Sequence, residues 1–455
     1  MLNLTYRASL LAFFFSIAAF AQDAPTSAPA IPQTSPKAAY DAAMHPLLVT
    51  RGSIGNWSDT EIAALKVSMA QAAIECSARP AKAFTGEDLV DLAQMCAFGQ
   101  SFPAVVEAAT PYIASTTVSK PRLNQAYAAL IDAQLHLKNE PAALITAQAM
   151  LSAVPYDALS AEVINEAIAY MQFNNTADAV TLATARQPLL LANLRTLANP
   201  PAETTPTSPA SQQPQSIHEL YADGLAFAAL QQLALQPSAS SAATVTDLDA
   251  ALPATLLPDE AAPIAALRRR YAFLGQPLPK LAGTPWPGAE AYLSNPHKLP
   301  QIPALHAITA LLLFPDWCAQ CVRMGSQFPQ SVFTVSGHEA YFYGLLAETV
   351  APLPAPKPNT PPPPVTPANS ANLLAETPTR TVDPSLLDQF AVTDPPFLIL
   401  TDAQGIIRVL QPVAEDAVAP RSTVDSAIAL IGKQWPLVNP ATKPAAAPVR
   451  PPQPL

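Results

Sequence analysis

Basic residues are scarce in this 455-residue chain, and charges of either sign are few. Lysine and arginine number 24 against 34 aspartates and glutamates, which gives a net charge of −10, and only 13% of the residues are charged. A nucleic-acid-binding protein needs concentrated positive charge to neutralise phosphates, so the composition argues against that class. The one basic run, Arg268–Arg270, is expected in the last turn of a helix, where cations interact favourably with the helix dipole.

Long hydrophobic runs are lacking as well. The apolar stretch from Leu10 to Phe20 is well short of the roughly 20 residues that a membrane-spanning helix needs, and no later segment is long and apolar enough. With Arg7 before it and Ala19-Phe20-Ala21 at its end, this stretch is typical of a signal peptide over residues 1–21. An uncleaved membrane anchor is the alternative. We therefore expect a periplasmic or secreted protein without a membrane span after signal cleavage.

Several motifs of enzyme chemistry are missing. The chain has no Gly-rich phosphate loop and no G-x-S-x-G sequence, so nothing indicates a P-loop nucleotide site or a serine hydrolase. Its six histidines show no His-x-x-His or similar spacing, and a zinc site needs four ligands close together. We predict no metal and no cofactor.

Cysteines are few, but their even number of four suits an oxidising compartment. Cys76 and Cys96 lie in sequence with helical spacing and are expected on neighbouring antiparallel helices, where a structural disulfide would stabilise the pair. Two buried free thiols are the alternative. Cys318 and Cys321 are only one helical turn apart and form a pair of a different kind.

Proline is abundant, with 52 residues, and marks the boundaries of the chain. Segments rich in Pro, Ser, Thr and Ala bury too little apolar surface to fold, and they favour extended, solvated conformations. They divide the chain into a signal peptide (1–21), a tether (22–36), a helical repeat-like domain (37–198), a linker (199–215), a helical segment (216–274), an α/β domain (275–436) with a Pro-rich insert (351–378), and a disordered tail (437–455).

Between Ser58 and Leu197 the apolar residues recur at helical spacing, which predicts an all-α region. Ser58 and Glu61 have the spacing of a capping box, and three prolines fall near helix starts. Three segments echo one another at a period of about 36 to 39 residues: FGQSFPAVVEAA (98–109), LKNEPAALITAQ (137–148) and FNNTADAVTLAT (173–184). They resemble tetratricopeptide repeats, with Ala104, Ala143 and Ala179 at small-residue positions. An irregular helical bundle is the alternative. Further helices are expected over 219–235 and 264–273.

The C-terminal part has a different pattern. HAITALLLF (306–314) and EAYFYGLLAE (339–348) are expected to be strands, and PFLIL (396–400) and GIIRVL (405–410) a hairpin around the turn TDAQ. A helix is expected near 385–390, and another is expected to be capped at Ser422–Asp425, with Ala427, Ile428, Leu430 and Ile431 facing inward. These elements predict a small α/β sandwich.

The first of these strands leads into Trp317-Cys318-Ala319-Gln320-Cys321 and then a helix. Cys318 is therefore expected at the helix N-terminus, where unpaired N–H groups and the positive end of the dipole favour a thiolate. The thiolate is the attacking species in disulfide exchange, and Cys321, one turn further on, can resolve a mixed disulfide. A non-exchanging bridge is the alternative.

The region from Gly275 to Lys433 resembles the thioredoxin superfamily, and within it the TlpA-like exported thioredoxins. The resemblance lies in the strand followed by Trp-Cys-x-x-Cys, and in PPFLIL followed by the Asp402-Ala403-Gln404-Gly405 turn. It implies a thioredoxin-like fold in which Cys318 is the nucleophile and Cys321 the resolving thiol. It also implies that Trp317 shields the pair and that Pro396 is a cis-proline lining the substrate groove.

Three features depart from that family. An acidic or amide residue often precedes the first cysteine by six positions, where this chain has Leu312. The residue before the cis-proline normally offers its N–H to the substrate, and Pro395 has none. The Pro-rich insert also interrupts the domain. These departures suggest a differently poised dithiol and weaker binding of peptide-like substrates.

The sequence as a whole therefore predicts a multi-domain protein, with an N-terminal all-α, tetratricopeptide-like region and a C-terminal α/β, thioredoxin-like domain. The predicted function is that of an exported thiol–disulfide oxidoreductase, whose partners are proteins with cysteine thiols. A non-catalytic interaction scaffold is the main alternative. A peroxidase fits less well, because the segment before Cys318 lacks the Pro-x-x-x-Thr/Ser-x-x-Cys pattern.

Overall fold

The computed structural model describes residues 34–54, 59–115, 122–198, 215–281, 284–285, 302, 306–316, 318, 321, 324–325, 328, 332–347, 379–392, 395–413 and 420–436. The predicted signal peptide, the Pro-rich insert, the tail and Ser58 of the expected capping box lie outside these residues. None of the helices within these ranges combines the length and hydrophobicity of a membrane-spanning segment.

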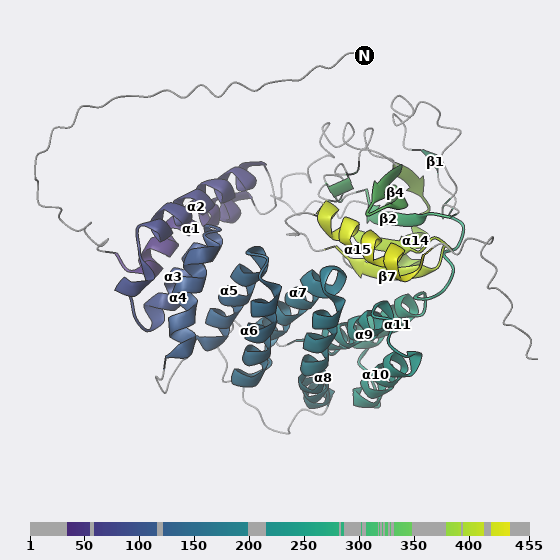
Figure 1. The fold of residues 1–455 in the computed structure, drawn as a ribbon, viewed down its shortest axis with the longest axis horizontal. Helices are drawn as coiled ribbons and strands as arrows, with labels where there is room; N and C mark the ends of the chain where they lie inside the picture. Colours follow the sequence, from purple (N-terminus) through teal and green to yellow (C-terminus); the bar gives the residue numbers. More distant parts are fainter. Residues whose placement is uncertain are drawn as a thin grey trace, which may run out of the picture.

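The N-terminal part of the described chain is helical, as predicted. Its helices are α1 (Pro36–Ile54), α2 (Asp59–Ser77), α3 (Glu87–Phe98), α4 (Phe102–Ala114), α5 (Leu123–His136), α6 (Glu140–Ala153), α7 (Ala158–Asn174), α8 (Thr176–Ala198), α9 (Ile217–Leu233), α10 (Ser238–Ala251) and α11 (Pro258–Tyr271), with a short 3₁₀ turn at Ala81–Ala83. Consecutive helices pack against each other in an extended array (Figure 1). The Ser- and Thr-rich α10 was not predicted.

Two of the three similar segments, 98–109 and 137–148, each contain the same type of turn. Gln100 and Lys138 have positive φ angles of 56° and 58°, at the ends of α3 and α5. In each case the next N–H binds a carbonyl five residues back, Ser101 to Cys96 and Asn139 to Gln134, both at 2.8 Å. This is the usual left-handed ending of a helix. The third segment differs, because Asn175 between α7 and α8 has φ −141°.

Gly99 is required where α2 and α3 meet. A Cβ atom at this position would lie 2.5 Å from the backbone nitrogen of Ala73. Because that neighbour is backbone, it cannot rotate away, and the two helices approach closely only with glycine at the end of α3. This contact brings the chain segments of Cys76 and Cys96 together.

The C-terminal part of the chain forms one mixed sheet. Its described strands are β1 (Thr284–Pro285), β2 (Ile308–Pro315), β3 (Val332–Val335), β4 (His338–Ala347), β5 (Thr379–Val382), β6 (Phe397–Thr401) and β7 (Ile407–Pro412). They are ordered β1-β5-β4-β2-β6-β7, and β3 pairs with β4. Strand β2 runs parallel to β4 and antiparallel to β6. The coarse prediction of a helical region followed by an α/β domain is therefore confirmed.

Some of the individual predictions in this domain are confirmed, and others are wrong or missing. The two long strands, the hairpin β6–β7 and the helix α14 (Ser385–Gln389) are confirmed. The short strands β1, β3 and β5 were not predicted. The predicted helix cap at Ser422–Asp425 is wrong, because α15 spans Pro420–Gln434 and Ser422 therefore lies inside the helix. Ala427, Ile428 and Ile431 are fully buried on its inner face, whereas Leu430 is only half-buried.

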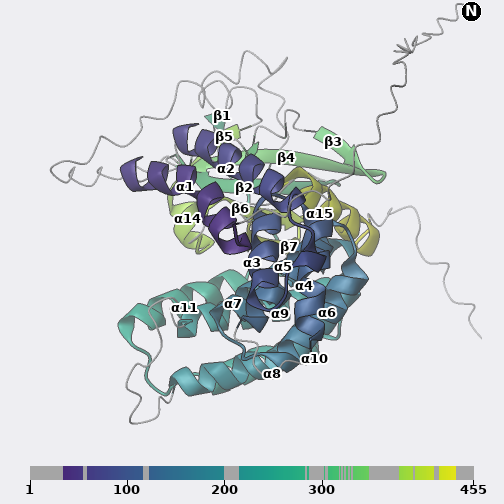
Figure 2. The same cartoon turned by 90° about the vertical axis from the view of Figure 1, so that its left-hand side faces the viewer.

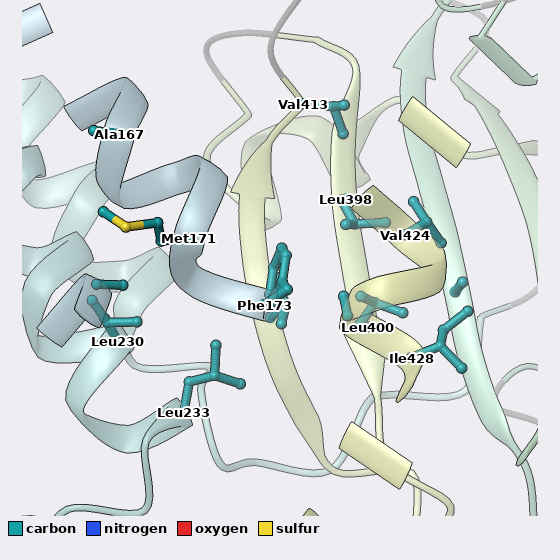
Figure 3. Packing of buried hydrophobic residues seen from close by; sticks show 14 of the residues in the cluster. Ala167, Met171, Phe173, Leu230, Leu233, Leu398, Leu400, Val413, Val424 and Ile428 are labelled. Carbon is teal, nitrogen blue, oxygen red and sulfur yellow. The ribbon is translucent and has the colours of Figure 1, made fainter. Parts of the chain in front are cut away.

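The helical array and the α/β domain share a hydrophobic core. Met171 and Phe173 of α7, with Leu230 and Leu233 of α9, belong to the same buried cluster as the residues of β6, β7 and α15 that face them. Figure 3 shows these two sets facing each other, with Leu398, Leu400, Val413, Val424 and Ile428 on the side of the sheet. Helix α15 packs on both α7 and β2. The α/β domain therefore covers the face of the helical array that α7 and α9 form (Figure 2).

A second connection joins α11 to the sheet. After α11 the chain runs beside β7, where the Gly275 N–H donates to the carbonyl of Ile407 and the Ile407 N–H donates to Gln276, both at 2.9 Å. The predicted basic last turn of α11 is confirmed. Arg269 and Arg270 donate to the carbonyls of Asp388 and Ala391. These arginines therefore hold the two parts of the protein together.

Candidate functional site

Strand β2 positions the Cys318–Cys321 pair. All eight residues from Ile308 to Pro315 are buried, because β2 is central in the sheet and both of its faces are covered. The apolar run that predicted the strand reflects this double burial. Beyond the strand, the Asp316 N–H donates to the carbonyl of Ala347 (3.1 Å), and the Cys318 N–H donates to that of Pro315 (3.2 Å). The first cysteine thus lies just past the carboxyl end of a central strand.

The two cysteines form a disulfide with their Cα atoms 5.3 Å apart. Cys321 has helical backbone, and its N–H donates to the Cys318 sulfur at 3.3 Å. Cys318 keeps 9% of its surface exposed, whereas Cys321 has none. Cys318 is therefore the more exposed residue of the pair, which is compatible with the predicted role of Cys318 as the nucleophile.

The described surroundings of the disulfide are apolar. Leu312 and Phe314 of β2, with Met324 and Phe328 after the pair, lie in the same buried cluster. Phe328 stacks on Phe342 of β4 with ring centroids 3.9 Å apart. Leu312, six residues before Cys318, is only 1% exposed and is packed in this apolar cluster.

Buried charge is found at the opposite end of the sheet. Asp402 is fully buried and accepts from Arg408 at 2.7 Å, and its other oxygen accepts from the N–H groups of Gln404 and Ile406. It follows β6, and Thr401 of that strand pairs with Thr309 near the start of β2. At about 3.3 Å per residue, this is roughly 20 Å from the end where Cys318 lies. Asp402 is therefore a structural residue of the turn.

A tyrosine with a raised pKa lies on the other face of the sheet. Tyr343 is fully buried, which raises its pKa from the usual 10.0 to about 12, although the Arg380 guanidinium, 5.0 Å from the ring centroid, acts against the shift. The residues of this cluster alternate along the strands with those around the disulfide. Tyr343 therefore does not take part in the cysteine chemistry.

The peptide bond between Pro395 and Pro396 is cis, as the resemblance implies. Leu313 pairs with Phe397, so the two prolines lie beside the end of β2 that leads to Cys318. The carbonyl of Pro396 accepts from the N–H of Val413 at 2.9 Å. Neither proline has an N–H, so this segment has no donor to offer to an extended chain.

Val413 was not among the residues predicted for the site. It directly follows β7, and Phe397 pairs with Pro412. The observed register therefore places 413 opposite 396. The predicted hairpin, with strands 396–400 and 405–410 around a four-residue turn, would place 409 there instead, so the sequence did not identify Val413.

The remaining site predictions concern separate places. Trp317 lies outside the described residues. Cys76 and Cys96 form a disulfide between α2 and α3, with a Cα–Cα distance of 5.1 Å, and they are 3% and 0% exposed. They lie within the apolar cluster of α1–α5. The predicted pairing is confirmed, and the burial indicates a structural bridge.

Among the described residues, no group of three or more His, Cys, Asp or Glu side chains could hold a metal ion. The described residues at the end of β2 provide a disulfide, a cis-proline segment, apolar packing and the nearby Asp316. No protein-family model, curated protein or solved structure matches the chain.

Proposed function

We propose that this protein is an exported thiol–disulfide oxidoreductase of the periplasm or the extracellular space, in which Cys318 and Cys321 are the redox-active pair. Its C-terminal domain is then thioredoxin-like, and its helical array is tetratricopeptide-like. The partner is a protein with cysteine thiols. The reaction requires no cofactor, because the two electrons are carried by the sulfur atoms.

The observation that supports this function best is the position and unequal exposure of the disulfide. It directly follows the central strand β2, beside a cis-proline, with Cys318 at 9% and Cys321 at 0% exposure. A bridge that serves only stability has no need to leave one of its two cysteines partly exposed. An exchange reaction needs one sulfur that a partner can attack and a second that only its neighbour can reach.

In the oxidising direction, a partner thiolate attacks Cys318, and a partner–Cys318 disulfide forms as the bond to Cys321 breaks. Cys321 leaves as a thiolate and takes up a proton. A second partner thiolate then attacks the partner sulfur and releases the Cys318 thiolate. The partner has lost two electrons, and the dithiol has gained them. Reduction of a partner is the reverse sequence.

The apolar surroundings affect the resolving step. Cys321 has no exposed surface, and described side chains near it such as Leu312 and Phe314 are uncharged. Burial disfavours the charged form of a thiol, because the thiolate loses its hydration. Formation of the Cys321 thiolate is therefore disfavoured, and a mixed disulfide on Cys318 is expected to be long-lived.

The test is a titration of both disulfides in glutathione buffers, followed by alkylation of free thiols and mass spectrometry. We expect Cys318–Cys321 to titrate between about −120 and −270 mV, with Cys318 alkylated faster than Cys321. The bridge Cys76–Cys96 is the internal control and should stay oxidised, since structural disulfides lie below about −300 mV. If Cys318–Cys321 behaves like the control, the proposed activity is refuted.

The second candidate function is a non-catalytic interaction scaffold, and one observation favours it. Both cysteines are nearly buried, and the adjoining Pro395–Pro396 segment offers no backbone donor to a substrate. Capture of partners with wild-type protein and with Cys318→Ser separates the two functions. A scaffold retains its partners after this substitution, whereas an exchange enzyme loses the disulfide-linked ones.

A further inference from the structure

Helices α1 and α2 form one end of the helical array (Figure 1), and α2 has apolar side chains on two opposite faces. Its inner face, which includes Ala72 and Cys76, is buried against the array. On its outer face Val67 is 58% exposed and Ile74 is 60% exposed. The terminal helices of a repeat array need a polar outer face to remain soluble as a single chain. The outer face of α2 therefore has the character of a contact surface.

The exposed residues of this outer face form one row along the helix, the α2 stripe, which consists of Thr60, Ala63, Val67, Ala70, Ile74 and Ser77. Their spacing of three and four residues places them on one side of an α-helix, and it is the spacing of the contact positions in coiled coils. A hydroxyl group stands at each end, and the four residues between the ends are apolar. The α2 stripe thus has the pattern of a helix–helix contact, and it is exposed in the single chain.

The α2 stripe is complementary to itself about its midpoint. When a second copy of α2 lies antiparallel to the first, with the two-fold axis at the middle of the stripe, Val67 faces Ala70 of the second copy. In the same arrangement Ile74 faces Ala63 of the second copy, and a hydroxyl residue faces a hydroxyl residue at each end. Each layer then combines one large and one small side chain, so the two helices can pack at a constant distance. In a parallel pair, layers of two large side chains would alternate with layers of two alanines, which leaves voids.

We propose that this protein forms a dimer in which the α2 stripes of two copies pack antiparallel on each other. This contact continues the packing within the array, where each helix is covered by the next one along the chain. The neighbouring helix α1, which packs on α2, adds Leu48 and Val49 to the apolar surface at this end of the array, each of them 56% exposed. The occupant of this surface is therefore a second copy of the same chain, because the pattern of large and small residues matches its own reversal.

The size of the α2 stripe sets the strength of the dimer. From Thr60 to Ser77 the stripe is roughly 26 Å long at 1.5 Å per residue, and a helix is about 10 Å wide. Helix α2 alone therefore offers a face of roughly 260 Å², against about 800 Å² per partner in a standard interface. We expect a weak dimer with a Kd in the micromolar range, which forms by mass action at high protein concentration.

The test is sedimentation velocity ultracentrifugation of the whole mature protein, with thiols blocked, from about 5 to about 500 μM. Nonreducing electrophoresis of the same samples excludes dimers that are linked through Cys318. We expect the wild type to shift from monomer to dimer as its concentration rises. Val67→Glu is expected to weaken this self-association at least a hundredfold, because each dimer would bury two carboxylates without partners, at a cost of at least tenfold each.

Adding Ala70→Lys to Val67→Glu tests the orientation of the two helices. In the antiparallel dimer the new carboxylate at position 67 faces the new ammonium group at position 70 of the second copy, so the double variant should regain most of the self-association. In a parallel pair, like charges would face each other and nothing would be regained. The matched control is Ile145→Glu on α6, where Ile145 is 67% exposed and lies outside the α2 stripe, and it should leave self-association unchanged.

Thermal unfolding checks the fold of each variant, and we expect Val67→Glu to keep the wild-type Tm because the position is exposed. A wild type that stays monomeric up to about 500 μM overturns the proposal and assigns the α2 stripe to a partner of another kind. Self-association that Val67→Glu leaves intact overturns it as well, and failure of the double variant to regain self-association overturns the antiparallel arrangement. None of these results bears on the proposed redox activity.

Discussion

Replacing Ile428 by alanine tests whether the helical array and the α/β domain fold as one unit. Ile428 lies on α15, is fully buried, and belongs to the cluster that also contains Met171 and Leu230 of the array. The substitution removes three carbon atoms from this core, which at about 0.8 kcal/mol each costs about 2.4 kcal/mol. A residual cavity adds to this cost, and such substitutions usually lie between about 2 and 5 kcal/mol.

Hydrogen exchange followed by mass spectrometry locates the effect. If the core is shared, Ile428→Ala lowers protection in α7 and α9 as well as in β6, β7 and α15. A loss of about 2.4 kcal/mol corresponds to roughly fiftyfold faster exchange of amides that open in the shared unfolding event. Urea unfolding should show one transition with a lower midpoint.

The matched control is Ile145→Ala on α6, where the isoleucine is 67% exposed and the expected change is within about 0.5 kcal/mol. If Ile428→Ala speeds exchange in the sheet and α15 but leaves α7 and α9 as protected as in the wild type, the two parts unfold independently. The argument for a shared core would then be refuted.

Two further outcomes follow from the structure. Replacing both Cys76 and Cys96 by alanine opens a crosslink across 20 residues, which should cost about 3 kcal/mol in urea unfolding while leaving the reduction potential of Cys318–Cys321 unchanged. A change in that potential would show that the two bridges are coupled. Burial raises the pKa values of Tyr221 and Tyr343 to about 12. Because the unfolded chain loses these protons near pH 10, their contribution to stability is complete below pH 10 and declines as the pH rises from 10 to 12. A Tm that stays constant from pH 9 to 12 would contradict it.

Local patterns in the sequence were sufficient for the main elements. The eight residues of β2 are apolar except for Thr309 and are all buried, as expected for a strand covered on both faces. The helical spacing of the apolar residues, with prolines near several helix starts, predicted the array. The spacing of Cys318 and Cys321 likewise places both sulfurs within one helical turn, and their pairing was predicted for this reason.

Short and polar elements escaped prediction, because their own residues do not specify them. Strands β3 and β5 have four residues each and depend on pairing with other strands, β3 with β4 and β5 with both β4 and β1. Helix α10 is rich in Ser and Thr, which have modest helix propensity, and it is stabilised by packing of Leu248 and Ala251 against α9. These elements depend on neighbours that are distant in the sequence.

The sequence alone predicted the longer helices and strands and the pairing of Cys318 with Cys321, because these properties arise from local spacing and from residue chemistry. It left open whether Cys76 and Cys96 are bridged. Only the tertiary structure decided which surfaces are covered. The apolar residues of α7 and α9 that contact the sheet have the same spacing as those that contact neighbouring helices, so no pattern distinguishes them. Likewise, the unpaired amide of Gln187 appears only once α8 is packed against its neighbours, because the satisfaction of a buried polar group depends on what surrounds it.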